Sequence, residues 1–248
     1  SQRRPVVAVA GGRAFTFRYP ETEELLRAAG CDVAEFDPLT ASALPAGTAG
    51  LYLGGGFPEV HAADLSANAT LRTAVRAAVD AGLPTVAECA GLLYLASSLD
   101  GQPMVGAVPA AAGMHPRLVL GYREATAVAD TLLARAGEAV TGHEFHRTRT
   151  PLLDGSAPAW SWSGPDGPVA DGVSLDSDST RCARGVSRSW LPGPSPTMAS
   201  RPRTGRRPTA QVASGVLCFS TSSSAPWAST DASATLGVPT ARSGASLG

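Results

Sequence analysis

The chain has no lysine: all 20 of its basic residues are arginine, against 21 acidic residues, which leaves a net charge of -1. Folding does not require this bias, whereas a GC-rich coding sequence produces it. The chain also has no apolar run near the roughly 20 residues that cross a bilayer. Residues 1–5 lead directly into an apolar stretch and do not form a signal-peptide pattern. We therefore expect no membrane partner and a cytoplasmic location.

Two motifs are missing as well. The cysteines Cys31, Cys89, Cys182 and Cys218 have no CxxC spacing, which argues against a zinc site or a disulfide framework and predicts no bound metal. A phosphate-binding GxxxxGK[ST] loop is also absent. ATP binding by this chain is therefore not expected, and we predict no cofactor here.

Residues 6–173 show an alternation of strand and helix signals. Continuous apolar runs ended by Gly or Pro predict buried strands, and helices are predicted where apolar residues share one face and Gly follows. This rhythm predicts an α/β fold with a mostly parallel sheet and helices on both faces, in which sites gather at the carboxyl ends of strands. The predicted strands cover residues 6–10, 31–36, 51–53 and 85–87, and the predicted helices cover 21–29 and 68–81.

Cys89 is the candidate nucleophile. It follows the strand at 85–87 and precedes an apolar helix that opens with Ala90 and Gly91. A tight strand-to-helix turn projects its side chain out of the sheet and points helix N–H groups at any oxyanion formed there. A buried core cysteine is the alternative that this pattern leaves open.

A glycine triplet, residues 54–56, follows the strand at 51–53. Consecutive glycines let backbone amides approach a ligand closely, which suits an oxyanion hole. The other interpretation is a flexible strand-to-helix turn. Because both segments lie at carboxyl ends of strands, we expect the triplet to meet Cys89 across the edge of the sheet.

Five segments in order resemble the motifs of the glutaminase domain of cobyrinic and hydrogenobyrinic acid a,c-diamide synthases. The resemblance covers about residues 5–173, and such domains belong to the class I-like glutamine amidotransferases. The parent enzymes are carbon–nitrogen ligases of cobalamin biosynthesis that use glutamine as amido donor. The segments are Val9–Tyr19, Leu53–His61, Glu88–Leu95, Leu120–Arg123 and Gly142–His146.

The resemblance implies a role for each matching residue. Cys89 would attack the glutamine amide and form a thioester, while backbone N–H groups of Gly55 or Gly56 and of Ala90 would hold the oxyanion. Gly91 would relieve crowding in the turn. For Glu88 a partly buried carboxylate paired to an arginine is favoured over a catalytic role. The expected pocket residues are Phe57, Glu59, Glu88, His143 and His146.

The resemblance also implies partners. Glutamine would be the substrate in this domain, and ATP and magnesium would bind only to an N-terminal amidoligase domain that this chain lacks. That domain would activate the acetate carboxylates of the corrinoid. A nucleic-acid partner is not expected.

The chain departs from the family at the catalytic base, which the family carries in a Tyr-x-His-x-His-like stretch about a hundred residues after the cysteine. No histidine follows His146 here. His143 or His146 could serve as base, although a structural role is favoured. The chain could thus be a remnant with little turnover. A cysteine-elbow α/β protein of the peptidase or redox-sensor kind is a further alternative.

Residues 174–248 differ from the rest in composition, with 8 arginines against 3 acidic residues and many Ser and Pro. Such a segment buries too little apolar surface to offset its chain entropy, so we expect no stable packed structure. We favour a shifted reading frame in GC-rich DNA as its origin. The alternative is a natural basic arm that binds nucleic acid weakly.

Overall fold

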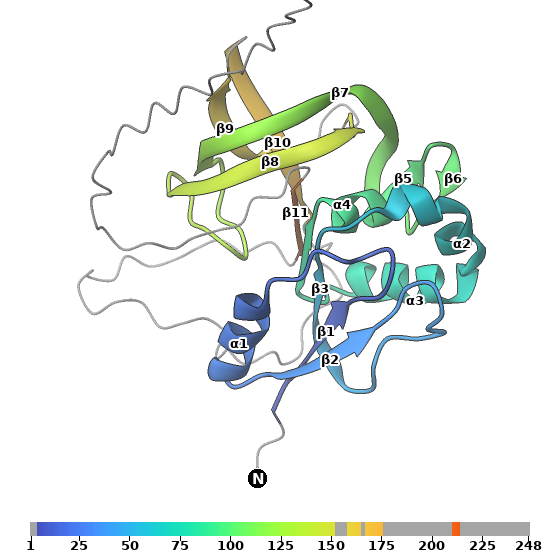
Figure 1. Cartoon of the computed structure of the whole chain (residues 1–248). Coiled ribbons are helices and arrows are strands. Elements are labelled where there is room, and N and C mark those ends of the chain that lie inside the picture. The colour runs from blue at the N-terminus through green and yellow to red at the C-terminus, as the bar shows by residue number, and fades with distance from the viewer. Residues whose placement is uncertain (1–3, 152–157, 165–166, 176–209, 214–248) are drawn as a thin grey trace, which may run out of the picture.

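The computed structural model describes residues 4–151, 158–164, 167–175 and 210–213 (Figure 1). Its first half contains four parallel strands in the spatial order β2-β1-β3-β4. The apolar runs at 6–10 and 85–87 form strands because both of their faces are covered. The strands are β1 (Val6–Ala10), β2 (Asp32–Phe36), β3 (Thr48–Leu53) and β4 (Thr85–Glu88).

Helices cover both faces of these strands, as predicted. On one face, Leu26 of α1 (Pro20–Ala28) packs with Val7 and Val9 of β1. On the other face, the core includes Val75 of α3 and the apolar residues of α4. The helical elements after β3 are η1 (Pro58–His61), α2 (Ala62–Ala67), α3 (Ala69–Asp80) and α4 (Ala90–Leu95).

Asn68 sets the start of α3. Its side-chain oxygen accepts a hydrogen bond from the Leu71 N–H, 3.3 Å away, which satisfies a donor of the first helical turn. Its amide nitrogen donates to the carbonyl oxygens of Pro38 and Ala41. The cap thus also anchors the helix to the loop after β2.

The second half extends the sheet with strands that were not predicted from the sequence. From β4 the order continues β11-β10-β9-β7, and β8 pairs with β7 as an antiparallel hairpin (Figure 1). Trp160 and Trp162 of β9 form a second core with Ala125 and Ala127 of β7. The strands are β5 (Ala96–Leu99), β6 (Gln102–Pro103), β7 (Val108–Ala127), β8 (Ala139–Arg149), β9 (Pro158–Gly164), β10 (Gly167–Leu175) and β11 (Ala210–Ala213).

Strand β11 lies within residues 174–248, for which we expected no stable packed structure. Its backbone pairs in parallel with β4 and antiparallel with β10, and β10 itself continues to Leu175. Both neighbouring strands would otherwise present an unpaired edge, which gives a physical reason for a third strand between them. The rest of that segment, including the proposed frameshift, lies outside the described residues.

The β7–β8 hairpin has an apolar outer face. Leu120 lies opposite Phe145, and Tyr122 lies opposite His143 in the antiparallel register. Tyr122 is 90% exposed and Leu120 is 65% exposed.

Within the described residues, no helix has the length and apolar character needed to cross a membrane.

Candidate active site

Cys89 forms a strained elbow between β4 and α4. Its φ is 51° and its ψ is -109°, a left-handed conformation that costs a residue with a Cβ roughly 1–3 kcal/mol and persists only where the surroundings enforce it. The elbow is enforced by α4, whose six residues are all buried. The strand-to-helix turn predicted from the sequence is therefore present, and it carries the backbone strain expected at a functional site.

Two backbone N–H groups point at the Cys89 sulfur. They belong to Gly56, in the triplet after β3, and to Ala90, the first residue of α4. The two segments come from neighbouring parallel strands and meet where both strands end. Sγ and these two N–H groups are called the cradle below. Of the two expected glycine donors, Gly56 occupies the position beside the sulfur.

The loop after β1 holds the glycine triplet in place. The Phe17 N–H donates to the Gly55 carbonyl oxygen at 3.1 Å, and the Phe57 N–H donates to the Ala14 carbonyl oxygen at 3.1 Å. A Cβ on Gly56 would lie 2.1 Å from that same Ala14 oxygen. Only glycine fits at this position, because the nearest atoms belong to the backbone.

Gly91 fills an equally tight place on the other side of the cradle. Its N–H donates to the Gly54 carbonyl oxygen at 3.0 Å. A Cβ here would lie 2.2 Å from the Leu53 carbonyl oxygen and 2.7 Å from the Leu53 Cβ. This close approach of α4 to β3 accounts for the crowding that the resemblance assigned to Gly91.

The environment of the thiol favours its protonated form. Burial raises the pKa of Cys89 above its usual value, the N–H groups of Gly56 and Ala90 lower it, and the carboxylates of Glu88 and Glu59 raise it further. The side chain is 9% exposed. Ionisation therefore needs a base or a ligand that alters this balance.

No arginine in the described part of the chain pairs with Glu88, contrary to the favoured expectation. It is 6% exposed and accepts a hydrogen bond from the Tyr52 hydroxyl at 2.5 Å. Burial raises the pKa of Glu88 to about 6, although the hydrogen bond from Tyr52 acts in the opposite direction. Tyr52 was not indicated by the sequence, because the alternation of β3 alone does not say which of its residues shares a face of the sheet with Glu88.

Phe57 and Glu59 lie next to the cradle in sequence and in space. The Phe57 ring contacts the Phe17 ring edge to face, with centroids 5.0 Å apart, and is 46% exposed. Glu59 on η1 is close enough for its charge to act on Cys89. Both therefore have positions consistent with the expected pocket.

His143 and His146 are hydrogen-bonded or packed within the β7–β8 hairpin. The His146 ring lies 3.4 Å from Glu144 Oε1 and 3.2 Å from the Thr148 carbonyl oxygen, and the His143 ring lies edge to face against Tyr122. Glu144 also forms an ion pair with Arg123. Burial acts to raise the pKa of Glu144, but His146 and Arg123 outweigh it and hold the pKa below its usual value. Within the described residues, no histidine is hydrogen-bonded to Cys89.

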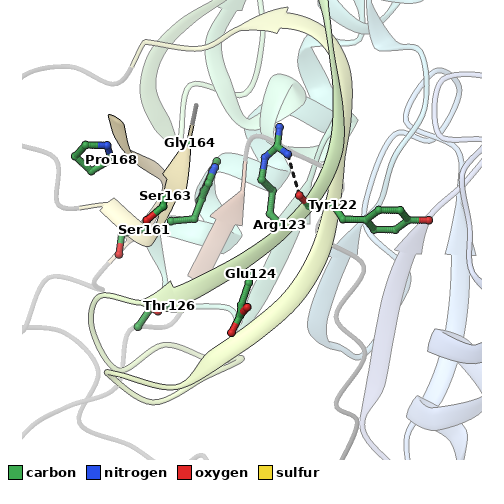
Figure 2. A pocket seen from close by; sticks show the side chains of 9 residues that line it. Tyr122, Arg123, Glu124, Thr126, Ser161, Ser163, Gly164 and Pro168 are labelled. Atoms are coloured by element: carbon green, nitrogen blue, oxygen red, sulfur yellow. Dashed lines mark hydrogen bonds between the residues drawn. The ribbon is translucent and has the colours of Figure 1, made fainter. Parts of the chain in front are cut away.

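A separate cavity of about 600 Å³ opens between β7 and β9 (Figure 2). Figure 2 shows the Arg123 guanidinium hydrogen-bonded to the Tyr122 carbonyl oxygen while the Tyr122 ring points away. No sequence pattern indicated this cavity, because the residues that line it come from three strands, β7, β9 and β10. Its lining comprises Tyr122, Arg123, Glu124, Thr126, Ser161, Trp162, Ser163, Gly164 and Pro168.

Among solved structures, the chain is similar in fold to PurLQS from Thermotoga maritima, with a TM-score of 0.55, 14% identity, and coverage of 71% of this chain and 84% of that one. A glutamine amidotransferase from the same organism has a TM-score of 0.51 and 11% identity, with 86% and 76% covered. These similarities establish the fold, which is that of glutamine amidotransferases of class I.

Curated relatives are more similar in sequence. The hydrogenobyrinate a,c-diamide synthase of Thermobifida fusca is 62% identical over 169 residues, which are 67% of this chain and 36% of that protein. The cobyrinate a,c-diamide synthase of a Synechococcus strain is 52% identical over 153 residues, 59% of this chain and 34% of that protein. The match thus spans about a third of these relatives. Residues 6–183 match the CobB/CobQ-like glutamine amidotransferase domain, and the chain belongs to that family.

Proposed function

We propose that this chain is the glutaminase part of an ATP-dependent corrinoid a,c-diamide synthase. Cys89 Sγ attacks the side-chain carboxamide carbon of glutamine, and the oxyanion formed is held by the N–H groups of Gly56 and Ala90. The C–N bond then breaks, and a γ-glutamyl thioester remains. Water attacks the thioester carbon, which releases glutamate and restores the thiol. The observation that carries this proposal is the strained Cys89 elbow with both N–H groups at its sulfur.

The thiol proton must reach the departing nitrogen so that ammonia can leave. The family resemblance implies a late histidine for this transfer, and residues 4–151 supply none that is hydrogen-bonded to Cys89. This point favours the second candidate, a catalytically deficient form of the domain. In that form the cradle binds glutamine, while the thioester forms slowly.

The wider reaction is proposed from the names of the relatives. Ammonia made at Cys89 would attack acetate carboxylates of a corrinoid after their activation by ATP and magnesium. We assign that activation to an amidoligase part like the portion of the relatives that lies outside the match, and no cofactor to the matched residues. The nucleophile has to be a reduced thiol, so we place the enzyme in the reducing cytoplasm.

Glutamate release from glutamine tests the proposal. The chain and its Cys89→Ala variant are compared at equal concentration, with and without the non-matching part of the Thermobifida fusca enzyme added in trans. We expect release that depends on Cys89. Equal rates of glutamate release by the two proteins in both conditions would contradict the glutaminase activity and favour the catalytically deficient form.

A redox-type function is kept as an alternative because a carboxylate next to an elbow cysteine can tune thiolate chemistry. Treatment with peroxide separates the two functions. Rapid, reversible oxidation of Cys89 without any glutaminase activity would favour the redox function, whereas glutamine-dependent glutamate release would favour the glutaminase.

A further inference from the structure

Tyr52 and Glu88 lie near the ends of β3 and β4, just before the two segments that supply the cradle. Tyr52 is on β3, two residues before the glycine triplet, and Glu88 is the residue before Cys89. Tyr52 pairs with Val86, and the last backbone pair between the strands is Leu53 with Ala87. Since side chains alternate along a strand, Tyr52 and Glu88 share one face of the sheet. Their hydrogen bond therefore joins β3 and β4 at the point where backbone pairing stops.

The Tyr52 ring also lies beside the triplet itself. A Cβ at Gly54 would lie 3.4 Å from Tyr52 Cε1, so the ring occupies the space next to the position where a Gly54 side chain would begin. The Gly54 carbonyl oxygen in turn accepts the Gly91 N–H of α4. Tyr52 is thus connected to both sides of the cradle, through Gly54 on one side and Glu88 on the other.

Among the described residues, no cationic side chain forms an ion pair with the Glu88 carboxyl group. The group is buried. Its pKa of about 6 makes it a carboxylate at neutral pH. The other titratable group that acts on the thiol is Glu59 of η1, and it has the same sign of charge.

We propose that Glu88 is a positioning residue with two separable effects on Cys89. Through the hydrogen bond from Tyr52 it ties together the two strand ends that supply the cradle N–H groups, and its buried negative charge, on the residue before Cys89, opposes a second negative charge on the sulfur. The effect on the cradle rests on the proposed glutaminase function. The effect of the charge on the thiol does not, and it can be measured without glutamine.

The effect of the charge is tested by alkylation with iodoacetamide, which reacts with the thiolate. The rate at Cys89 is followed against pH by mass spectrometry of the peptide that contains it. Glu88→Gln removes the charge and keeps an oxygen that can accept from Tyr52, so the midpoint of the profile should fall by about one pH unit. Glu24→Gln, on the exposed side of α1, is the matched control and should leave the midpoint unchanged. An unchanged midpoint in Glu88→Gln would overturn this part of the proposal.

The positioning effect is tested by Tyr52→Phe, which removes the donor but keeps the charge. Labelling by 6-diazo-5-oxo-L-norleucine, a glutamine-shaped electrophile, should fall about 10-fold relative to labelling by iodoacetamide, because a misplaced cradle costs rate. The iodoacetamide midpoint should stay that of the parent chain. An unchanged ratio would overturn the positioning role.

The outcomes separate the two proposals. If the parent chain is not labelled by the glutamine-shaped electrophile, the glutaminase function and the positioning role both fail, while the alkylation profile still decides the effect of the charge. Circular dichroism of each variant checks that it folds. If Glu88→Gln does not fold, Glu88→Met, which fills a similar volume with an uncharged side chain, takes its place. A midpoint that stays unchanged in that variant would overturn the effect of the charge.

Discussion

Replacement of Gly56 by alanine gives a sharp test of the cradle. The added Cβ would lie 2.1 Å from the Ala14 carbonyl oxygen and 2.8 Å from the Phe15 Cα, whereas ordinary contacts begin at 3.4 Å. The shortfall is about 1.3 Å. Neither neighbour is a movable side chain, so the Gly56 N–H must shift away from the Cys89 sulfur. Loss of one oxyanion donor costs about 10²- to 10³-fold in rate.

The assay for this variant is labelling of Cys89 by the glutamine-shaped electrophile, together with glutamate release. Both should fall by about that factor, because both need the oxyanion to be held by the displaced N–H. Gly113→Ala is the matched control: its nearest neighbour is Asp100 Oδ1 at 3.2 Å, a side-chain atom that can move. A folded Gly56→Ala variant with the parent rate would refute the assignment of Gly56 as an oxyanion donor.

The remaining predictions concern stability and pairing. Gly91→Ala should lower the free energy of unfolding by about 1–3 kcal/mol, measured in urea, because its Cβ would collide with the backbone of β3. Burial raises the pKa of Glu88 from 4.5 to about 6. The folded state therefore binds this proton more tightly, and its stabilising effect is complete below pH 4.5 and lost as the pH rises through 6. Relative to Glu88→Gln, the parent chain should lose about 2 kcal/mol of stability over that range. Backbone amides of Ala210–Ala213 should be protected from hydrogen exchange as those of β1 are, because β11 lies between two strands; free exchange there would contradict this pairing.

The parallel part of the fold could be predicted because its signals are local. The apolar run at residues 6–10 is buried on both faces and forms a strand with the predicted bounds. The helix at 68–81 was predicted from its apolar face and its glycine stop, and the structure has it at Ala69–Asp80. The elbow at Cys89 was also predicted, since a short strand followed at once by small residues leaves few other conformations.

The features that were missed depend on residues far apart in sequence. The predicted arginine partner of Glu88 was wrong. Its partner Tyr52 lies on another strand, and the register between two strands is not encoded by either one alone. The β7–β8 hairpin was missed because burial along β7 alternates but residue type does not follow it: the half-buried positions include Gly121 and Arg123, while Leu120 and Tyr122 are exposed. The expectation for residues 174–248 was made from composition, which does not reveal four residues that complete a sheet.

The position of β4 in the sheet has a consequence for the order of folding. One of its neighbours, β3, precedes it closely, but the other is β11, so Thr85 is paired with Ala210 across half the chain. Pairing over such a separation is slow, because a long loop must close first. During synthesis one edge of the nucleophile strand therefore stays unpaired until residues 210–213 have also left the ribosome.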